Sequence, residues 1–255
     1  VKGLLARRAR TAATDAGEEA SLESALEAAR PPATANPLSA DPVIRESVRG
    51  ICASILLSQS SHPPRVLLVT SCVPAEGKST IVAELGLALA DSGARTLLVE
   101  CDMRRPSLGQ RFGVNGEGGL TLFLAGHVGP TPAIHQTDNA NLFVVAVGPS
   151  APNPPALLNS DRLRTFLHEM TSQFRFVILD APPVLPIADA RVLAPMAEGV
   201  ILVVRAGYAS KDLVRRVCGM LRSTGANVLG AVFNGAETAT PSGSGYRSFD
   251  DYYGS

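Results

Sequence analysis

Residues 65–80 read RVLLVTSCVPAEGKST, and the segment IVAELGLALADSG follows directly at residues 81–93. An apolar, β-branched run thus passes through a short loop and a GKS tripeptide into a helical pattern. This order is what a phosphate-binding loop requires, because the loop and the first helical turn point backbone N–H groups at a phosphate. In such a loop Lys78 reaches the β- and γ-phosphate oxygens, and the Ser79 hydroxyl ligates Mg²⁺. The strict pattern has glycine where Cys72 stands, so the match is partial.

Apolar runs and helical patterns alternate along the rest of the chain. The runs are near-continuous in Val, Ile and Leu, which indicates strands that are buried on both faces. They fall at 65–70, 95–101, 141–147, 175–180, 200–205 and 227–233. The helical stretches that would supply crossover connections fall at 79–92, 160–172, 186–197 and 210–223. We therefore predict an α/β fold with a doubly wound, mostly parallel sheet that is flanked by helices.

The composition fits a folded domain and argues against several classes of function. Of 255 residues, 45% are hydrophobic and 18% charged, which provides enough apolar material for a sizeable core. Lys+Arg and Asp+Glu both number 23, and there is no Trp, so binding to nucleic acid is disfavoured. The four cysteines form no CxxC pair and are expected as reduced thiols. No apolar run approaches the roughly 18 residues of a membrane span.

The composition changes at both ends of the predicted domain. Residues 1–40 are rich in Ala and in charge, and we expect a flexible arm or a juxtamembrane linker there. The pair Asp41-Pro42 is typical of a helix start, so the folded domain is expected over 41–235. Residues 236–255 are polar and rich in Gly and Ser, which predicts a disordered tail. This tail holds three of the four tyrosines, Tyr246, Tyr252 and Tyr253.

Acidic residues close two of the predicted strands. Glu100 and Asp102 end the run LLVECD, and at i and i+2 of an extended chain their side chains point the same way. Asp180 ends the run FVILD, as in a Walker B motif, where the carboxylate acts on Mg²⁺ directly or through water. A strand-terminal Asp alone can also be a helix N-cap. Because ligands bind at the carboxyl ends of strands in an open α/β sheet, we expect these carboxylates near Lys78.

Three of these stretches together resemble the motifs of one protein family. TSCVPAEGKST, LLVECDMRRP and VILDAPPVLPIADA are similar to the Walker A, Walker A′ and Walker B motifs of bacterial tyrosine kinases. These are P-loop NTPases with a MinD/ParA-like fold that autophosphorylate a C-terminal tyrosine cluster. The segments IRESVRG, GGLTLFLAG and PNPPALLNSDRLRTFL match as well, so the resemblance covers roughly residues 37–255.

The resemblance implies an ATP-dependent protein-tyrosine autokinase that uses ATP and Mg²⁺. It gives catalytic roles to Lys78, Glu100, Asp102 and Asp180, with Glu100 as the base for the tyrosine hydroxyl. It gives Mg²⁺ the ligands Ser79, Asp102 and Asp180. The nucleotide would meet Pro74, Ala75, Glu76, Gly77, Lys78, Ser79, Thr80 and Asn234. The phosphoacceptors would be Tyr246, Tyr252 and Tyr253.

The resemblance also implies a place of action and partners. The family forms the cytoplasmic kinase domains of exopolysaccharide and capsule export systems, at the inner face of the cell membrane. The membrane-embedded co-polymerase part is a separate chain or lies upstream of Val1 in the same polypeptide. Subunits of the family pack through an ExxRxxR pattern in the leading helix. Here Glu46 and Arg49 match, whereas Cys52 stands at the second Arg position, so we expect a weakened homo-oligomer.

Two further departures from the family concern the nucleotide site. Ala75 stands where the family has glycine, and a positive φ there would cost on the order of 1 kcal/mol. Glu100 stands where the family has Asp and is one methylene longer. A displacement of about 1 Å can cost on the order of 10²-fold in rate, so we expect modest activity.

Two other functions fit the same motifs. The first is a ParA/MinD-like ATPase switch, although those proteins carry an additional Lys near the start of the loop and residues 70–77 contain none. The second is a nucleotide-binding scaffold in which Ala75 and Glu100 have weakened catalysis. Phosphotyrosine formation with Mg·ATP distinguishes the kinase from both, and phosphate release distinguishes the switch from the scaffold.

Overall fold

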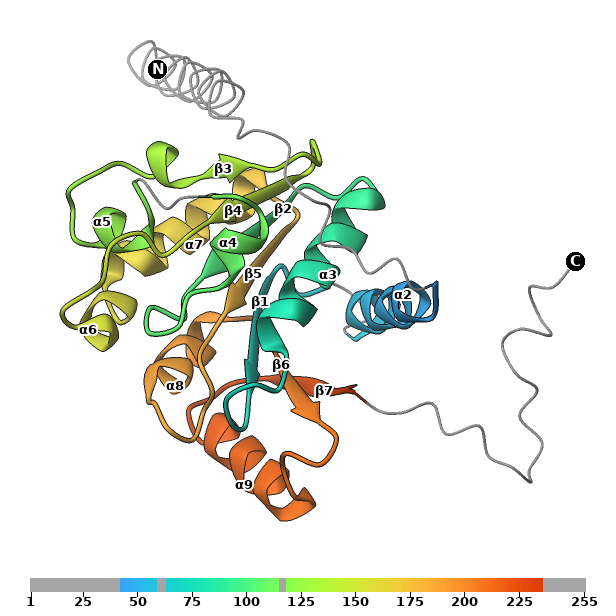
Figure 1. Cartoon of the computed structure of the whole chain (residues 1–255). Coiled ribbons are helices and arrows are strands. Elements are labelled where there is room, and N and C mark those ends of the chain that lie inside the picture. Colours follow the sequence, from blue (N-terminus) through green and yellow to red (C-terminus); the bar gives the residue numbers. More distant parts are fainter. Residues whose placement is uncertain (1–41, 59–62, 115–117, 236–255) are drawn as a thin grey trace, which may run out of the picture.

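The computed structural model describes residues 42–58, 63–114 and 118–235. Within these ranges one sheet has the strand order β3-β4-β2-β5-β1-β6-β7 (Figure 1). The strands are β1 (Val66–Ser71), β2 (Thr96–Glu100), β3 (His135–Gln136), β4 (Leu142–Val145), β5 (Phe176–Asp180), β6 (Gly199–Arg205) and β7 (Val228–Asn234). All pairs are parallel except that of the short β3 with β4. The predicted doubly wound, mostly parallel sheet is confirmed.

Helices cover both faces of the sheet (Figure 1). One face is packed by α2 (Pro42–Leu57), α3 (Lys78–Asp91) and α4 (Leu108–Arg111). The other is packed by α5 (Leu120–Leu124), α6 (Pro154–Leu158), α7 (Asp161–Gln173), α8 (Asp189–Leu193) and α9 (Lys211–Arg222). Short 3₁₀ turns are η1 (Thr131–Ala133) and η2 (Ala194–Met196). Alternate residues of β1 enter the two cores, which explains why its apolar run is uninterrupted.

The order of the strands sets the position of the site. β1 lies between β5 and β6, and β5 lies between β1 and β2, so the loops after β1, β2 and β5 are neighbours. In register, Asp180 is paired with Val69 of β1 on one side and with Glu100 of β2 on the other. The acidic strand ends and the loop before α3 therefore meet at the carboxyl edge of the sheet.

One predicted helix is much shorter than expected. The interval 186–197 was predicted to be helical throughout, but α8 spans only Asp189–Leu193 and a 3₁₀ turn follows it. Prolines explain both limits, because Pro186 restricts the chain before the helix and Pro195 lies inside η2. The two-residue β3 was also missed, since a strand that short leaves no periodic signal.

The predicted ends of the chain are described only in part. The arm expected over 1–40 and the tail expected over 236–255 lie outside the described residues. The helix expected from Asp41-Pro42 is present as α2. Among the residues that are described, no helix has the length and apolar character that crossing a membrane requires.

Candidate functional site

The loop between β1 and α3 turns sharply just before Lys78. Gly77 caps the helix with φ of 90°, and a Cβ on it would lie 2.2 Å from Nδ2 of Asn234. Ala75 has φ of 65°, the one positive value for a non-glycine residue in the described ranges. A left-handed alanine costs roughly 1–2 kcal/mol, so the loop carries strain beside the helix N-terminus that would receive a phosphate.

Glu76 holds this loop from within. Its carboxylate is fully buried, with Oε2 accepting from the N–H of Val73 at 2.8 Å and Oε1 from the N–H of Arg205 at 3.2 Å. The side chain of Asn234 donates to the Glu76 carbonyl at 2.9 Å, and the Arg205 guanidinium donates to the Ala75 carbonyl at 3.2 Å. The ends of β6 and β7 thus brace the loop. Contacts of Glu76 and Asn234 with nucleotide remain a prediction.

Lys78 lies against the acidic end of the β2 segment. Its Nζ is 2.8 Å from Oδ2 of Asp102, and the two side chains are only 14% and 4% exposed. Oδ1 of Asp102 accepts from the N–H of Arg105 at 3.1 Å, which fixes the carboxylate. The Walker A and Walker A′ segments, which are 24 residues apart at these two positions, are therefore joined by an ion pair.

Asp180 is the most perturbed carboxyl group of this region. Its side chain is 1% exposed, and this burial raises the pKa of its carboxyl group from 3.8 to about 7. The Lys78 ammonium and the Ser79 hydroxyl act against the rise in pKa, whereas the negative charges of Glu100 and Asp102 add to it. Such a group would be stabilised as a carboxylate by any further cation that approached it.

The surroundings of Asp180 fit Mg²⁺. Both of its carboxylate oxygens are buried and have no hydrogen-bond partner within the described residues. Ser79, a buried hydroxyl, and Asp102 lie close enough to shift the pKa of Asp180. Mg²⁺ is usually held by one or two carboxylates, with waters and substrate phosphates completing the octahedron. The residues present therefore suit a magnesium ion that enters together with a nucleotide.

Glu100 makes more hydrogen bonds than its predicted role requires. It is buried, and its Oε1 accepts from the N–H groups of Ser107 and Leu108, both at 2.5 Å. Its Oε2 accepts from the N–H of Val147 at 3.1 Å. The carboxylate thus ties the loop after β2 and the start of α4 to the end of β4. Its role as a base remains a prediction, and among the described residues the second acceptor position of Oε2 is the one that no backbone N–H uses.

Other residues placed at the loop are less enclosed. Pro74 is exposed, and the hydroxyl of Thr80 accepts from the guanidinium of Arg111 at 2.9 Å. On α2, Glu46 and Arg49 are exposed and form an ion pair at 3.4 Å, whereas Cys52 is buried in the core with its pKa raised to about 11 by burial. The three predicted acceptor tyrosines lie outside the described residues.

Sequence reasoning missed two arginines near the site. Arg104 donates through Nε to the fully buried Asp189 at 3.2 Å, which links the loop after β2 to the start of α8. Arg205 ends β6 and braces the phosphate-binding loop, as described above. Arg205 carried the same signal that identified Asp180, a charged residue after a buried apolar strand. Asp189 stood near the end of a quoted motif, but nothing in the sequence indicated its partner.

Comparisons with known proteins agree with this geometry. A family model described as "ParA: NUBPL iron-transfer P-loop NTPase" matches residues 63–254. The putative tyrosine-protein kinase CapB of Staphylococcus aureus is 33% identical over 191 residues, which cover 75% of this chain and 84% of CapB. The kinase domain of the Escherichia coli tyrosine kinase ETK superposes with a TM-score of 0.74 at 28% identity, covering 80% of each chain.

A longer relative is similar over part of its length. The putative tyrosine-protein kinase EpsB of Ralstonia solanacearum is 32% identical over 200 residues, which cover 78% of this chain but only 26% of EpsB. The fold and the phosphate-binding loop define the class of this protein as a P-loop NTPase of the ParA type, a fold that implies nucleotide binding. Within that class, the chain belongs to the bacterial tyrosine kinase family.

Proposed function

We propose that this chain is an ATP-dependent protein-tyrosine autokinase that regulates the synthesis and export of exopolysaccharide or capsule. The observation that carries the proposal is the meeting of Lys78, Asp102 and the unpartnered Asp180 at the carboxyl edge of the sheet. A P-loop alone would also suit an ATPase switch. The membership of the chain in the tyrosine kinase family favours transfer of the phosphoryl group to a tyrosine over transfer to water.

The phosphates of ATP would bind at the N-terminus of α3. Backbone N–H groups of the loop that contains Pro74, Ala75 and Gly77 and of the first helical turn would donate to them, and the helix dipole favours negative charge at this end of α3. Lys78 would move its ammonium group from Asp102 to the β- and γ-phosphate oxygens. Asn234, which donates to the Glu76 carbonyl in the loop, would contact the adenine.

Ser79, Asp102 and Asp180 would hold Mg²⁺. The ion, when bound, neutralises charge on the phosphate oxygens and orients them. Asp180 supplies the buried carboxylate whose oxygens lack other partners, and Asp102 supplies the carboxylate that Lys78 releases when it reaches the phosphates. This exchange keeps the charge around Asp102 balanced as Lys78 moves.

The transfer joins the tyrosine oxygen to the γ-phosphorus and breaks the bond between that phosphorus and the β–γ bridging oxygen, so ADP leaves. Lys78 offsets the negative charge in the loose transition state. The phenolic proton, with an unperturbed pKa of about 10, would pass to Glu100. Backbone N–H groups use both acceptor positions of Oε1 and one of Oε2, so the second position of Oε2 would receive the proton.

We also propose that the kinase works at the inner face of the cell membrane with a membrane-embedded co-polymerase. The match to one quarter of the longer EpsB supports an arrangement in which such a domain joins further protein segments. A neutral balance of 23 basic and 23 acidic residues favours no nucleic-acid partner.

The test is incubation of the purified chain with Mg·ATP, followed by mass spectrometry for phosphotyrosine and an assay for released phosphate. We expect phosphotyrosine in the chain and its loss in Lys78→Met, which removes the charge that acts on phosphate. Lys211→Met is the matched control, because Lys211 is an exposed lysine at the start of α9. Phosphate release without phosphotyrosine would support the ATPase switch, and neither product would support the scaffold.

A further inference from the structure

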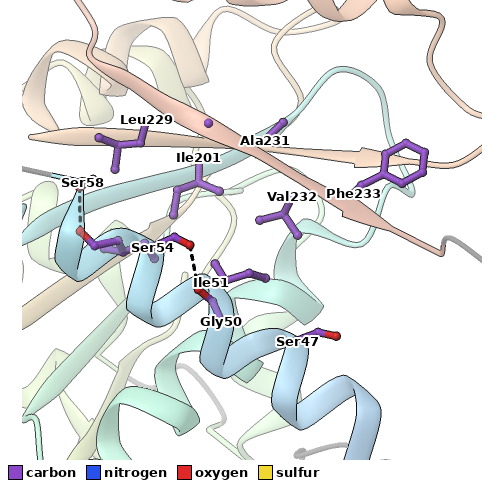
Figure 2. Close-up of a pocket in the computed structure, with 12 residues that line it drawn as sticks. Ser47, Gly50, Ile51, Ser54, Ser58, Ile201, Leu229, Ala231, Val232 and Phe233 are labelled. Carbon is purple, nitrogen blue, oxygen red and sulfur yellow. Dashed lines mark hydrogen bonds between the residues drawn. The ribbon is translucent and has the colours of Figure 1, made fainter. Parts of the chain in front are cut away.

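A groove of about 550 Å³ lies between α2 and strand β7 at the edge of the sheet (Figure 2). Ile51 and Ser54 of α2 form one wall, Leu229 and Val232 of β7 form the other, and Ile201 of β6 lies at the base. The groove is elongated and follows the two elements that enclose it, so an extended peptide fits its shape.

The chemistry of the groove is apolar although three serines line it. Their hydroxyls donate to carbonyls of their own helix, Ser47 to Val43 at 2.8 Å, Ser54 to Gly50 at 2.9 Å and Ser58 to Ile55 at 2.7 Å. In the described part of the chain, no charged residue lines the groove. The walls therefore suit aliphatic or aromatic side chains, and they offer nothing that would pair with a phosphate group.

Strand β7 is an apolar edge strand that the described residues leave partly exposed. Its sequence is VLGAVFN, yet none of its residues is buried, whereas every residue of β1, β2, β4 and β5 is buried. Phe233 is 64% exposed, and among the described residues β7 has a neighbouring strand on one side only. Folded proteins rarely leave an apolar edge strand open, because it invites pairing with other chains. A cover over this apolar edge would therefore be favourable.

We propose that the C-terminal segment 236–255 of the same chain occupies this groove through its aromatic residues. The segment starts at Ala236, two positions after the last residue of β7, and Phe233 of β7 lies with Ser47 at one end of the groove (Figure 2). Gly235 has φ of 64°, which suits a reversal, and Pro241, Gly243 and Gly245 follow.

The groove can hold only part of the C-terminal segment at one time. From Leu229 to Phe233 the strand rises about 13 Å at roughly 3.3 Å per residue, so four or five extended residues fill the groove. The segment has 20 residues and four aromatic side chains, Tyr246, Phe249, Tyr252 and Tyr253. Residues 1–41 precede α2 in the sequence, but they contain no aromatic residue. Aromatic content and attachment to β7 therefore favour the C-terminal segment.

The docked segment would control the acceptor tyrosines, an inference that rests on the proposed kinase function. A docked tyrosine is kept from an active site. A phosphate on it adds about −1.5 to −2 charges at pH 7 to a segment that already carries Asp250 and Asp251, and the groove lining has no cation to pair with the added charge. Phosphorylation would thus release the segment and expose β7.

The experiment measures amide hydrogen exchange of residues 229–233 in the full chain without nucleotide. Replacing the four aromatic residues (Tyr246→Ser, Phe249→Ser, Tyr252→Ser, Tyr253→Ser) should speed this exchange about tenfold. Ala231→Glu places a negative charge in the groove and should have the same effect. Ala140→Glu, at an exposed turn before β4, is the matched control and should leave the exchange unchanged.

Equal exchange in the full chain and in the fourfold Ser variant would overturn the proposal. So would protection that rises with protein concentration, since a second copy would then fill the groove. Incubation with Mg·ATP adds a separate readout, in which exchange should rise with the amount of phosphotyrosine. If no phosphotyrosine forms while the Ser variant still exchanges faster, the docking holds and only the proposed kinase function fails.

Discussion

Ala75 carries a backbone conformation that glycine adopts at no cost. Its φ of 65° lies in the left-handed region, and its carbonyl accepts from Arg205, which holds it there. We predict that Ala75→Gly raises the free energy of unfolding by up to about 1 kcal/mol, because relief of the strain exceeds the added entropy of the unfolded chain. Denaturant titration measures this.

Ala53→Gly is the opposite case and serves as the control for Ala75. Ala53 is exposed within α2, where glycine costs about 1 kcal/mol relative to alanine. Its free energy of unfolding should fall. A loss of stability in Ala75→Gly that equals the loss in Ala53→Gly would contradict the strain assigned to the loop.

Asp180 predicts a pH dependence of stability in the absence of nucleotide and Mg²⁺. The pKa of its carboxyl group is about 7 in the folded chain, and we take 3.8 for the unfolded chain. Between pH 3.8 and 7 the folded chain therefore binds a proton that the unfolded chain has lost. The contribution of Asp180 to the free energy of unfolding is complete below pH 3.8 and is lost as the pH rises to 7. The slope of this loss is up to about 1.4 kcal/mol per pH unit. Asp180→Asn should flatten this slope between pH 5 and 7.

Urea titrations at several pH values compare the two chains. The informative quantity is the difference in their free energies of unfolding, because other carboxyl groups titrate in both. A difference that is constant between pH 5 and 7 would show that the pKa of Asp180 is close to its ordinary value.

At the residue scale, the sequence predicted which residues belong to the candidate site better than it predicted their contacts. Lys78, Ser79 and Asp180 were predicted because each stands at a fixed distance from a strand that is recognisable by its apolar run. The ion pair between Arg104 and Asp189 joins residues 85 positions apart, and no local pattern encodes it. The engagement of Glu100 by three backbone N–H groups likewise depends on where the loop after β2 folds back.

At the scale of elements, α2 carries a prediction about assembly. Glu46 and Arg49 form an exposed ion pair on its surface, and Cys52 is turned into the core, where it cannot contact another subunit. We predict that the chain self-associates through this surface and that the double variant Glu46→Ala, Arg49→Ala shifts the oligomer toward monomer in light scattering. Stability should change little, because exposed pairs contribute about 0–1 kcal/mol.

The matched control for α2 lies on α9. Asp212 and Arg215 form an exposed ion pair with the same spacing, and their double Ala variant should not alter the oligomeric state. An equal shift in both double variants would mean that loss of charge, and not the α2 surface, governs assembly. If the wild-type chain, without phosphate on its tyrosines, is monomeric at high concentration, the predicted self-association is wrong.

Elements with strong periodicity were predicted well, and those limited by proline or by the sheet edge were not. The strands of the centre follow uninterrupted apolar runs because both faces are covered. β7 has a similar apolar run, which predicted a buried strand, but it lies at the edge and none of its residues is buried. Position in the sheet is a property of the topology, and a single strand's sequence does not contain it.

At the scale of the whole molecule, the predicted acceptor tyrosines and the proposed active site belong to different parts of the chain. A Gly/Ser-rich segment of the length of residues 236–255 has an r.m.s. reach of roughly 20–25 Å, which raises its effective concentration at a neighbouring active site within an oligomer. We predict phosphorylation in trans on Tyr246, Tyr252 and Tyr253. Asp250 and Asp251 lie beside them, so a fully phosphorylated segment is strongly anionic and should loosen the oligomer by repulsion.

The test mixes Lys78→Met chains, which keep residues 236–255, with active chains that lack them. Phosphotyrosine should then appear on the Lys78→Met chains at the three named positions, because only transfer between chains can place it there. Tyr208, the fourth tyrosine, is a built-in control, since it is about half exposed and has the Arg205 guanidinium 4.5 Å from its ring centroid. Label confined to Tyr208 would show that the active site accepts any accessible tyrosine, and that residues 236–255 are not its dedicated substrate.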